Sequence, residues 1–283
     1  MSLLDIQSLT AGYRRDAPVL HGVSLTADPG EFVGLVGPNG SGKTTLIRAA
    51  SRSLPPSAGR VMLEGQDAWE MPSREFACRV AVVPQETAVP FDMTSLEIVL
   101  LGRHPHVGRL HLENAADEGV ALAALESVNA GPLAGRSVKR ISGGERQRVI
   151  IAKALAQEPR LLLMDEPTAH LDIAQQTEVM SLVARLARER NMAVVAVLHD
   201  LNLAATWCDR VVILHEGRVA ANGPPAQVIT EPLVARVWQA RMWVKRHPAT
   251  GRPYLLPMPP PYEPEEEEEG VISPLIHVVC GGG

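Results

Sequence analysis

Residues 32–45 read Phe-Val-Gly-Leu-Val-Gly-Pro-Asn-Gly-Ser-Gly-Lys-Thr-Thr, and the architecture of the chain follows from this stretch. A short apolar run leads into a glycine-rich turn, and the turn opens into a helical pattern. The spacing Gly37-x-x-x-x-Gly42-Lys43-Thr44 is that of a phosphate-binding loop, the P-loop. A chance glycine turn is disfavoured, because the strand, loop and helix contexts all fit this motif.

The residue types of this loop suit the chemistry of phosphate binding. The glycines let backbone N–H groups converge on a polyanion with no Cβ in the way. The positive end of the helix dipole points at the same phosphates. Lys43 adds a mobile charge for the β- and γ-phosphates, and the Thr44 hydroxyl can ligate Mg²⁺. The candidate phosphate-binding residues are Gly37, Pro38, Asn39, Gly40, Ser41, Gly42, Lys43, Thr44 and Thr45.

The overall composition is that of an ordinary globular protein. The 283 residues can hold one large domain or two small ones, and 46% are hydrophobic. The net charge of -5 provides no basic field, so we expect no nucleic-acid partner. Cys78, Cys208 and Cys280 lack metal-ligand spacing, which suits a reducing compartment. Without a signal peptide or a membrane-spanning apolar run, we expect a cytosolic chain that meets a membrane only through a partner.

Two further apolar runs end in residues that can act on phosphate. The strand predicted at Leu161–Met164 leads into Asp165 and Glu166, and the strand at Ala193–Leu198 leads into His199. A doubly wound fold places its chemistry at the carboxyl ends of such strands. We expect Asp165 to hold Mg²⁺, Glu166 to orient the attacking water and His199 to touch the γ-phosphate. The alternatives are a helix cap or solvated acid pair and a structural histidine.

Gln85 and Tyr13 each have two interpretations. Gln85 directly follows the strand and proline predicted at residues 79–84, so it is either a solvated turn residue or an Mg²⁺ ligand that senses the attacking water. Tyr13 lies between two short strands that precede the P-loop. It is either a surface aromatic or a platform on which a purine ring stacks.

Residues from about 94 to 140 lose the strand pattern and carry apolar residues at helical spacing, which predicts a helical insertion into an α/β core. Three histidines, His104, His106 and His111, lie close together in this insertion. Their spacing fits no standard pair of helical metal ligands, and Pro105 makes the segment a loop. We therefore favour a docking or packing loop over a metal site.

Ser142-Gly-Gly-Glu145 opens another helix with the spacing of a capping box. Two glycines directly after the cap weaken a helix. Gly143 and Gly144 therefore suggest that the backbone here approaches an anion. The chain thus contains a second candidate phosphate-binding helix start.

The carboxyl-terminal part divides into three. Residues 244–256 predict a small hairpin that closes a domain of residues 1–257. Residues 258–270 contain prolines and five consecutive glutamates, which is typical of an extended linker. Residues 271–283 end in a glycine string and are either a tail or the start of a truncated further domain.

These motifs resemble one family, the nucleotide-binding subunits of ABC transporters, over about residues 3–256. The signature motif, at this distance before the acidic strand end, makes the match specific. The resemblance implies an α/β P-loop NTPase with a RecA-like core, an antiparallel β subdomain and a helical subdomain, using ATP and Mg²⁺. The matching residues are the adenine-stacking Tyr13, the Walker A loop 37–45, the Q-loop residue Gln85, the signature Ile141–Glu145, the Walker B strand 161–166, the D-loop 169–172 ending in Asp172, and the switch histidine His199.

The resemblance also implies a mechanism and partners. Two copies would close head-to-tail around two ATP molecules, with Ser142 and Gly144 of one copy on the γ-phosphate held by the other. The cycle would drive a polytopic permease at the cytoplasmic face of the membrane, indirectly serving a solute-binding protein. The signature departs from the commonest form at Ile141 and Glu145, but its Ser-Gly-Gly core is intact, so we expect activity to survive.

Within the family, residues 101–106 and 246–253 resemble the importers of iron chelates, haem and cobalamin. The sequence does not identify the cargo among these three. Two other functions are disfavoured. A soluble ABC-type ATPase acting on nucleic acid or ribosomes usually carries two cassettes or long coiled coils, and a non-catalytic sensor would not need Glu166 and His199.

Overall fold

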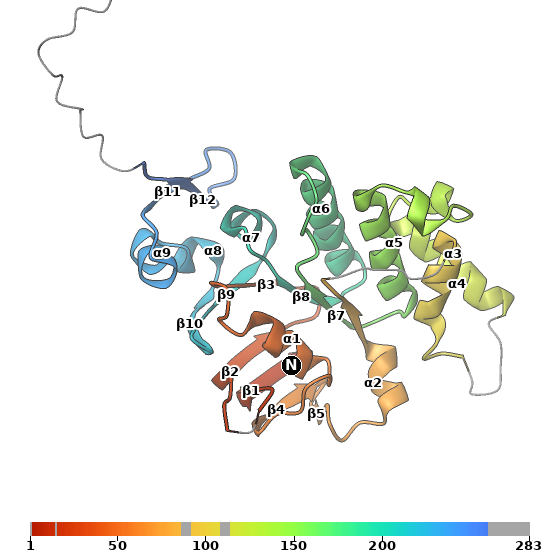
Figure 1. The fold of residues 1–283 in the computed structure, drawn as a ribbon, viewed down its shortest axis with the longest axis horizontal. Helices are drawn as coiled ribbons and strands as arrows, with labels where there is room; N and C mark the ends of the chain where they lie inside the picture. The colour runs from red at the N-terminus through yellow and green to blue at the C-terminus, as the bar shows by residue number, and fades with distance from the viewer. Residues whose placement is uncertain (1, 15, 86–91, 108–113, 260–283) are drawn as a thin grey trace, which may run out of the picture.

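The computed structural model describes residues 2–14, 16–85, 92–107 and 114–259 (Figure 1). Its centre is a six-stranded sheet that is parallel except for β10, which pairs antiparallel with β9. The strands in spatial order are β10 (Arg218–Gly223), β9 (Arg210–His215), β3 (Phe32–Val36), β8 (Ala193–Val197), β7 (Leu161–Asp165) and β6 (Val80–Val83).

The inner strands read as continuous apolar runs because both faces of the sheet are covered. In β7, Leu161 and Leu163 join the hydrophobic core on one face, and Leu162 and Met164 join the core on the other. Successive side chains of a strand point to opposite faces, so one uninterrupted run supplies both cores.

One face of the central sheet packs against helix α1 and an antiparallel sheet (Figure 1). Helix α1 (Lys43–Ala50) directly follows the P-loop and contributes Leu46 and Ile47 to this core. Helix α2 (Ser73–Arg79) was not predicted from sequence, since it is short and begins after Pro72. The antiparallel strands, in spatial order, are β2 (Leu20–Ala27), β1 (Leu4–Ala11), β4 (Ala58–Leu63) and β5 (Gln66–Asp67).

Helices cover the opposite face of the central sheet (Figure 1). The helical insertion packs against α5. A hairpin, β11 (Met242–Arg246) with β12 (Pro253–Pro257), packs against α7 through β12. The helices are α3 (Ser95–Leu100), α4 (Ala115–Ser127), α5 (Gly143–Ala156), α6 (Ile173–Glu189), α7 (Leu201–Trp207), α8 (Pro225–Val228) and α9 (Glu231–Trp238), with 3₁₀ turns η1 (Leu101–Arg103), η2 (Gly131–Leu133) and η3 (Val138–Arg140).

The histidine loop of the insertion is a packing loop. Arg74 of α2 donates to the carbonyls of Pro105 (2.7 Å) and His106 (2.8 Å). The His106 ring lies 2.9 Å from the carbonyl of Gln157 at the end of α5. Within the described residues, no cluster of three side chains is suited to holding a metal ion, and His111 lies outside them.

Arg103 anchors the same loop from inside. Its buried guanidinium bonds Asp117 of α4 at 3.1 Å and Glu158 after α5 at 2.7 Å. The preceding Gly102 is required by close packing, since a Cβ there would lie 2.1 Å from the carbonyl oxygen of Lys153 in α5. The insertion and α5 are therefore fixed to each other by ion pairing and by direct backbone contact.

The predicted α/β core, antiparallel sheet and helical insertion are confirmed. Residues 260–270 of the predicted linker and all of the predicted tail, 271–283, lie outside the described residues. In the described part of the chain, no helix combines the length and the apolar character needed to cross a membrane.

Candidate functional site

Four neighbouring strands end at one edge of the central sheet, and each is followed by residues predicted to act on nucleotide. The spatial order is β3, β8, β7, β6. The P-loop follows β3, His199 follows β8, Asp165 ends β7 with Glu166 next, and Gln85 follows β6. Because these strands are parallel, their carboxyl ends meet at the same edge.

The P-loop is shaped by a close backbone approach. A Cβ at Gly37 would lie 2.1 Å from the carbonyl oxygen of Leu214 in β9, so only glycine fits there. The Lys43 ammonium donates to the carbonyls of Gly37 (2.8 Å) and Pro38 (2.9 Å). These bonds hold the lysine inside the curve of the loop.

Lys43 is only 6% exposed. Burial lowers its pKa, and the carboxylates of Glu166 and Asp165 oppose that shift. A partly desolvated cation gains more from a bound anion than a cation in water does, since screening is weaker. The electrostatics therefore suit a polyphosphate.

Asp165 and Thr44 face each other across the site. The Thr44 hydroxyl donates to Asp165 Oδ1 at 3.2 Å. Asp165 is 8% exposed, and burial raises the pKa of its carboxyl, while the Thr44 hydrogen bond works in the opposite direction. A buried carboxylate next to a hydroxyl oxygen is a ligand set that fits a hard cation such as Mg²⁺.

Glu166 is held at both carboxylate oxygens. Its Oε1 lies 2.6 Å from His199 Nε2, and its Oε2 accepts a 2.7 Å hydrogen bond from Gln85 Nε2. The backbone of Glu166 has φ of 52°, a left-handed conformation that is unfavourable for a side-chain-bearing residue. Such strain clusters at functional sites, where surrounding contacts enforce it.

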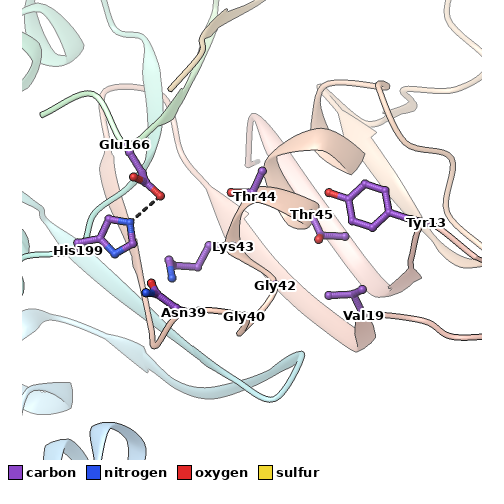
Figure 2. Close-up of a pocket in the computed structure, with 10 residues that line it drawn as sticks. All are labelled: Tyr13, Val19, Asn39, Gly40, Gly42, Lys43, Thr44, Thr45, Glu166 and His199. Carbon is purple, nitrogen blue, oxygen red and sulfur yellow. Dashed lines mark ion pairs between the residues drawn. The ribbon is translucent and has the colours of Figure 1, made fainter. Parts of the chain in front are cut away.

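Lys43, Thr44, Glu166 and His199 line a cavity of about 360 Å³. Figure 2 shows Glu166 and His199 at one end and Tyr13 at the other, with Lys43 and Thr44 between them. The full lining is Tyr13, Val19, Asn39, Gly40, Gly42, Lys43, Thr44, Thr45, Glu166 and His199.

The P-loop contains polar groups that can bind a ligand. The Ser41 hydroxyl is buried and has no hydrogen-bond partner among the described residues. Buried polar groups are nearly always satisfied, so an orphan here indicates a missing partner. At Gly40, by contrast with Gly37, a Cβ would meet no atom within 4 Å, which leaves the backbone open to an approaching group. The site therefore fits a nucleoside triphosphate with Mg²⁺.

The signature segment does not line this cavity. Ser142 caps α5 as predicted, accepting from the Glu145 N–H while the Glu145 carboxylate accepts from the Ser142 N–H. The two glycines of this segment differ in their surroundings. A Cβ at Gly144 would meet Gln175 of α6 at 2.8 Å, whereas at Gly143 the nearest atom is 3.9 Å away. Gly144 thus lies against the side chain of Gln175, whereas Gly143 has an open face.

Asp172 also lies apart from the cavity lining. Its side chain accepts from the Gln175 N–H at 2.8 Å and so caps α6. The structure thus brings together Tyr13, the P-loop, Gln85, Asp165, Glu166 and His199. It leaves Asp172 and residues 142–145 outside this pocket.

Comparison with known proteins identifies the family. The family model described as ABC transporter matches residues 20–169, which is more than half of the chain. The chain belongs to the ABC transporter family. Its cassette is therefore an ATP-binding ATPase unit, as the sequence indicated.

Several curated relatives are similar over most of the chain. The hemin import ATP-binding protein HmuV of Myxococcus xanthus is 47% identical, covering 83% of this chain and 90% of the relative. The ferric enterobactin transport ATP-binding protein FepC of Escherichia coli is 36% identical, covering 89% and 93%. The cobalamin import ATP-binding protein BtuD of Halobacterium salinarum is 39% identical, covering 93% of this chain and 64% of that relative.

Solved structures support the same fold. A transporter chain in an inward-facing conformation, provisionally assigned to the metal-chelate type, matches with a TM-score of 0.80 at 27% identity over 91% of this chain and 98% of its own length. A bacterial ABC transporter cassette solved as a dimer matches with a TM-score of 0.68 at 28% identity, over 78% and 98%. The ABC cassette fold predicted from sequence is confirmed.

Sequence reasoning missed Val19 and Arg48. Val19 lines the cavity from the loop before β2. Arg48 of α1 contacts Tyr13. Neither belongs to a motif, since their roles depend on how β1, β2 and α1 pack together. The one signal in the sequence was a charged residue, Arg48, within the otherwise apolar segment 46–50.

Proposed function

We propose that this chain energises an importer, coupling ATP binding and hydrolysis to the uptake of an iron chelate, haem or a cobalamin-type molecule through a membrane permease. The observation that carries the ATPase part is the convergence of Lys43, Asp165 and Glu166 at one sheet edge. The import part is supported by the relatives, whose names specify hemin, ferric enterobactin and cobalamin.

In this proposal the residues around the cavity have separate roles toward ATP. Residues 37–45 hold the triphosphate through backbone N–H groups, and Lys43 exchanges its two carbonyl partners for phosphate oxygens. Tyr13 stacks on the purine ring. Glu166 accepts a proton from the attacking water, since Gln85 and His199 hold its carboxylate in one orientation.

Thr44, Asp165 and Gln85 are the residues we assign to Mg²⁺. Asp165 provides the one buried carboxylate of this group, and Thr44 already contacts it. Bound Mg²⁺ supplies positive charge that neutralises the phosphate oxygens. The ion would also relieve the cost of keeping Asp165 ionised in a buried place.

We propose further that a second copy of the chain completes the site. Ser142, Gly143, Gly144 and Glu145 form a capped helix start that does not line the cavity of its own chain. A helix start with an open glycine at position 143 suits the phosphate of another copy. Asp172, beside this segment, would lie in the same interface. A related cassette has been solved as a dimer.

The partners and location follow from this assignment. A permease would anchor the pair of cassettes at the cytoplasmic face of the membrane, and a solute-binding protein would deliver cargo to that permease. We would tag the chain in its native cells, solubilise the membranes gently and identify the co-purifying proteins. A polytopic membrane protein supports the proposal, whereas ribosomal or DNA-bound partners without one would support the soluble ATPase instead.

The cargo needs a separate experiment. Deletion of this gene should abolish growth on one of three supplements, namely hemin, a ferric siderophore or cobalamin, under conditions that require it. Re-expression of the native chain should restore growth, and re-expression of Glu166→Gln should not. Growth of the deletion strain on all three supplements would contradict the import assignment.

A further inference from the structure

Arg48 makes two contacts with one exposed aromatic ring. Its guanidinium carbon lies 5.5 Å from the centroid of the Tyr13 ring, and its Nη1 donates to the Tyr13 hydroxyl at 3.0 Å. Tyr13 is 56% exposed. The tyrosine is therefore held by its face and its hydroxyl, rather than by burial.

A free tyrosine at this position would lose side-chain entropy when a base stacked on it. A ring that is already fixed binds more tightly, since the ordering has taken place before the ligand arrives. The Arg48 contacts provide such ordering in the free protein. They also tie the ring to α1, the helix that begins at Lys43, so one rigid element sets the spacing between ring and phosphate loop.

Tyr13 lines the cavity, and Arg48 does not belong to that lining. Arg48 therefore acts on a ligand through the tyrosine. A guanidinium over a ring leaves the opposite face available for stacking.

We infer that Arg48 is a positioning residue for base recognition, which fixes the Tyr13 ring so that a purine stacks on it at a set distance from the phosphate loop. This inference rests on the proposed binding of ATP in this cavity. It assigns to Arg48 a share of the affinity for the base and none of the affinity for the phosphates.

A competing role exists in the same structure. Burial raises the pKa of Asp165, and the positive charge of Arg48 is one of the smaller causes that oppose this shift. If Arg48 acted mainly through the metal-binding carboxylate, its loss would affect any triphosphate. A ligand without a base separates the two roles, and inorganic tripolyphosphate is such a ligand.

The test measures Kd by calorimetry for ATP and for tripolyphosphate, each with Mg²⁺. The proteins are the native chain, Arg48→Ala, Arg48→Lys, Tyr13→Ala and the double variant. We expect Arg48→Ala to raise the Kd for ATP about two- to fivefold, the range of an exposed cation–π contact, with tripolyphosphate unchanged. The Kd of Arg48→Lys for ATP should lie between those of the native chain and Arg48→Ala, because lysine keeps the charge and loses the planar guanidinium. In steady-state assays KM should rise while kcat stays the same.

The double variant provides the decisive comparison. With Tyr13→Ala already present, Arg48→Ala should have no further effect on ATP binding. An equal loss for ATP and tripolyphosphate, or no loss for ATP, would overturn the inference. Failure of the native chain to bind either ligand, or unaltered binding after Lys43→Ala, would instead reject the proposed function. Because Arg48 and Tyr13 are exposed, the unfolding temperatures of the Arg48 and Tyr13 variants should match that of the native chain and exclude misfolding as the cause.

Discussion

His199 Nε2 lies 2.6 Å from Glu166 Oε1. His199 follows β8 and Glu166 follows β7, so the two side chains meet because these strands are neighbours in the sheet. Gln85, at the end of the next strand, occupies the other carboxylate oxygen at 2.7 Å. Three adjacent strand ends thus fix the orientation of one carboxylate. This relationship makes the assigned roles separately testable.

We expect Glu166→Gln to lower kcat for ATP hydrolysis by about 10²–10⁴-fold, the usual contribution of a positioned base. The amide keeps the size of the carboxylate, but only one of its two terminal atoms can accept a hydrogen bond, and it cannot accept the proton of the attacking water. ATP binding should persist, and size-exclusion chromatography with ATP should show an accumulated dimer. Glu118→Gln, an exposed glutamate of α4, is the matched control and should behave like the native chain. A Glu166→Gln variant that hydrolyses ATP normally as a monomer would show that the assigned role is wrong.

His199→Ala should reduce kcat by about 10–100-fold and change the Kd for ATP much less. Loss of the contact frees one oxygen of Glu166, and hydrogen bonds to charged groups contribute about 1.5–3 kcal/mol. The double variant with Glu166→Gln should be no slower than Glu166→Gln alone, since the histidine acts on that carboxylate. Additive losses in single-turnover hydrolysis would mean that His199 works independently.

Lys43→Ala should weaken the binding of ATP and of inorganic tripolyphosphate alike, by about 10–150-fold. The ammonium is the cation held inside the loop by Gly37 and Pro38, so its removal affects the phosphates whatever base is attached. Calorimetry measures both ligands, and Lys245→Ala on the exposed hairpin strand β11 is the control. Binding that survives unaltered would remove the basis for the P-loop assignment.

Asp165→Asn should stabilise the nucleotide-free protein at neutral pH by about 0.5–2 kcal/mol, the range seen when functional strain is removed. Folding raises the pKa of Asp165 through burial. A raised carboxyl pKa contributes stability that is fully present below the unfolded value and is lost as pH rises through the folded one. At neutral pH the ionised and buried carboxylate therefore lowers the free energy of unfolding, and a neutral asparagine does not.

The pH dependence checks this explanation. The advantage of Asp165→Asn in chemical denaturation should shrink as the pH falls into the range where Asp165 becomes protonated. The same variant should lose Mg²⁺-dependent ATPase activity. A stability difference that stays constant with pH would point to packing at Thr44 instead of charge.

Arg103→Ala should destabilise the fold more than the loss of an exposed ion pair does, because Asp117 would keep only the hydrogen bond from the Asn114 N–H. Arg14→Ala is the matched control, since its ion pair with Asp16 is exposed and such pairs contribute about 0–1 kcal/mol. Urea unfolding of both variants measures the difference. Equal effects would mean that the buried Arg103 pair contributes no more to stability than an exposed ion pair does.

The P-loop, the acidic strand end, the capped helix at Ser142 and the helical insertion were all predictable from sequence. Each is a local pattern, in which residues close along the chain share one element, and the structure confirms these elements. Helix α2 was missed because seven residues after a proline give too little periodicity to detect. The contact between Gly144 and Gln175 of α6 joins residues from two separate helices, so no local pattern could have predicted it.

Local patterns in the sequence predict which residues end strands, which loop has the P-loop spacing and which family the chain resembles, because backbone chemistry and motif spacing are properties of short segments. Only the folded chain shows that β3, β8, β7 and β6 lie side by side, which brings Lys43, His199 and Glu166 to one cavity and places Gln85 in contact with Glu166. It also shows that Arg48 reaches Tyr13 and that Ser142 stays away from the cavity of its own chain. Strand order is set by long-range packing of two hydrophobic cores, which no local pattern records.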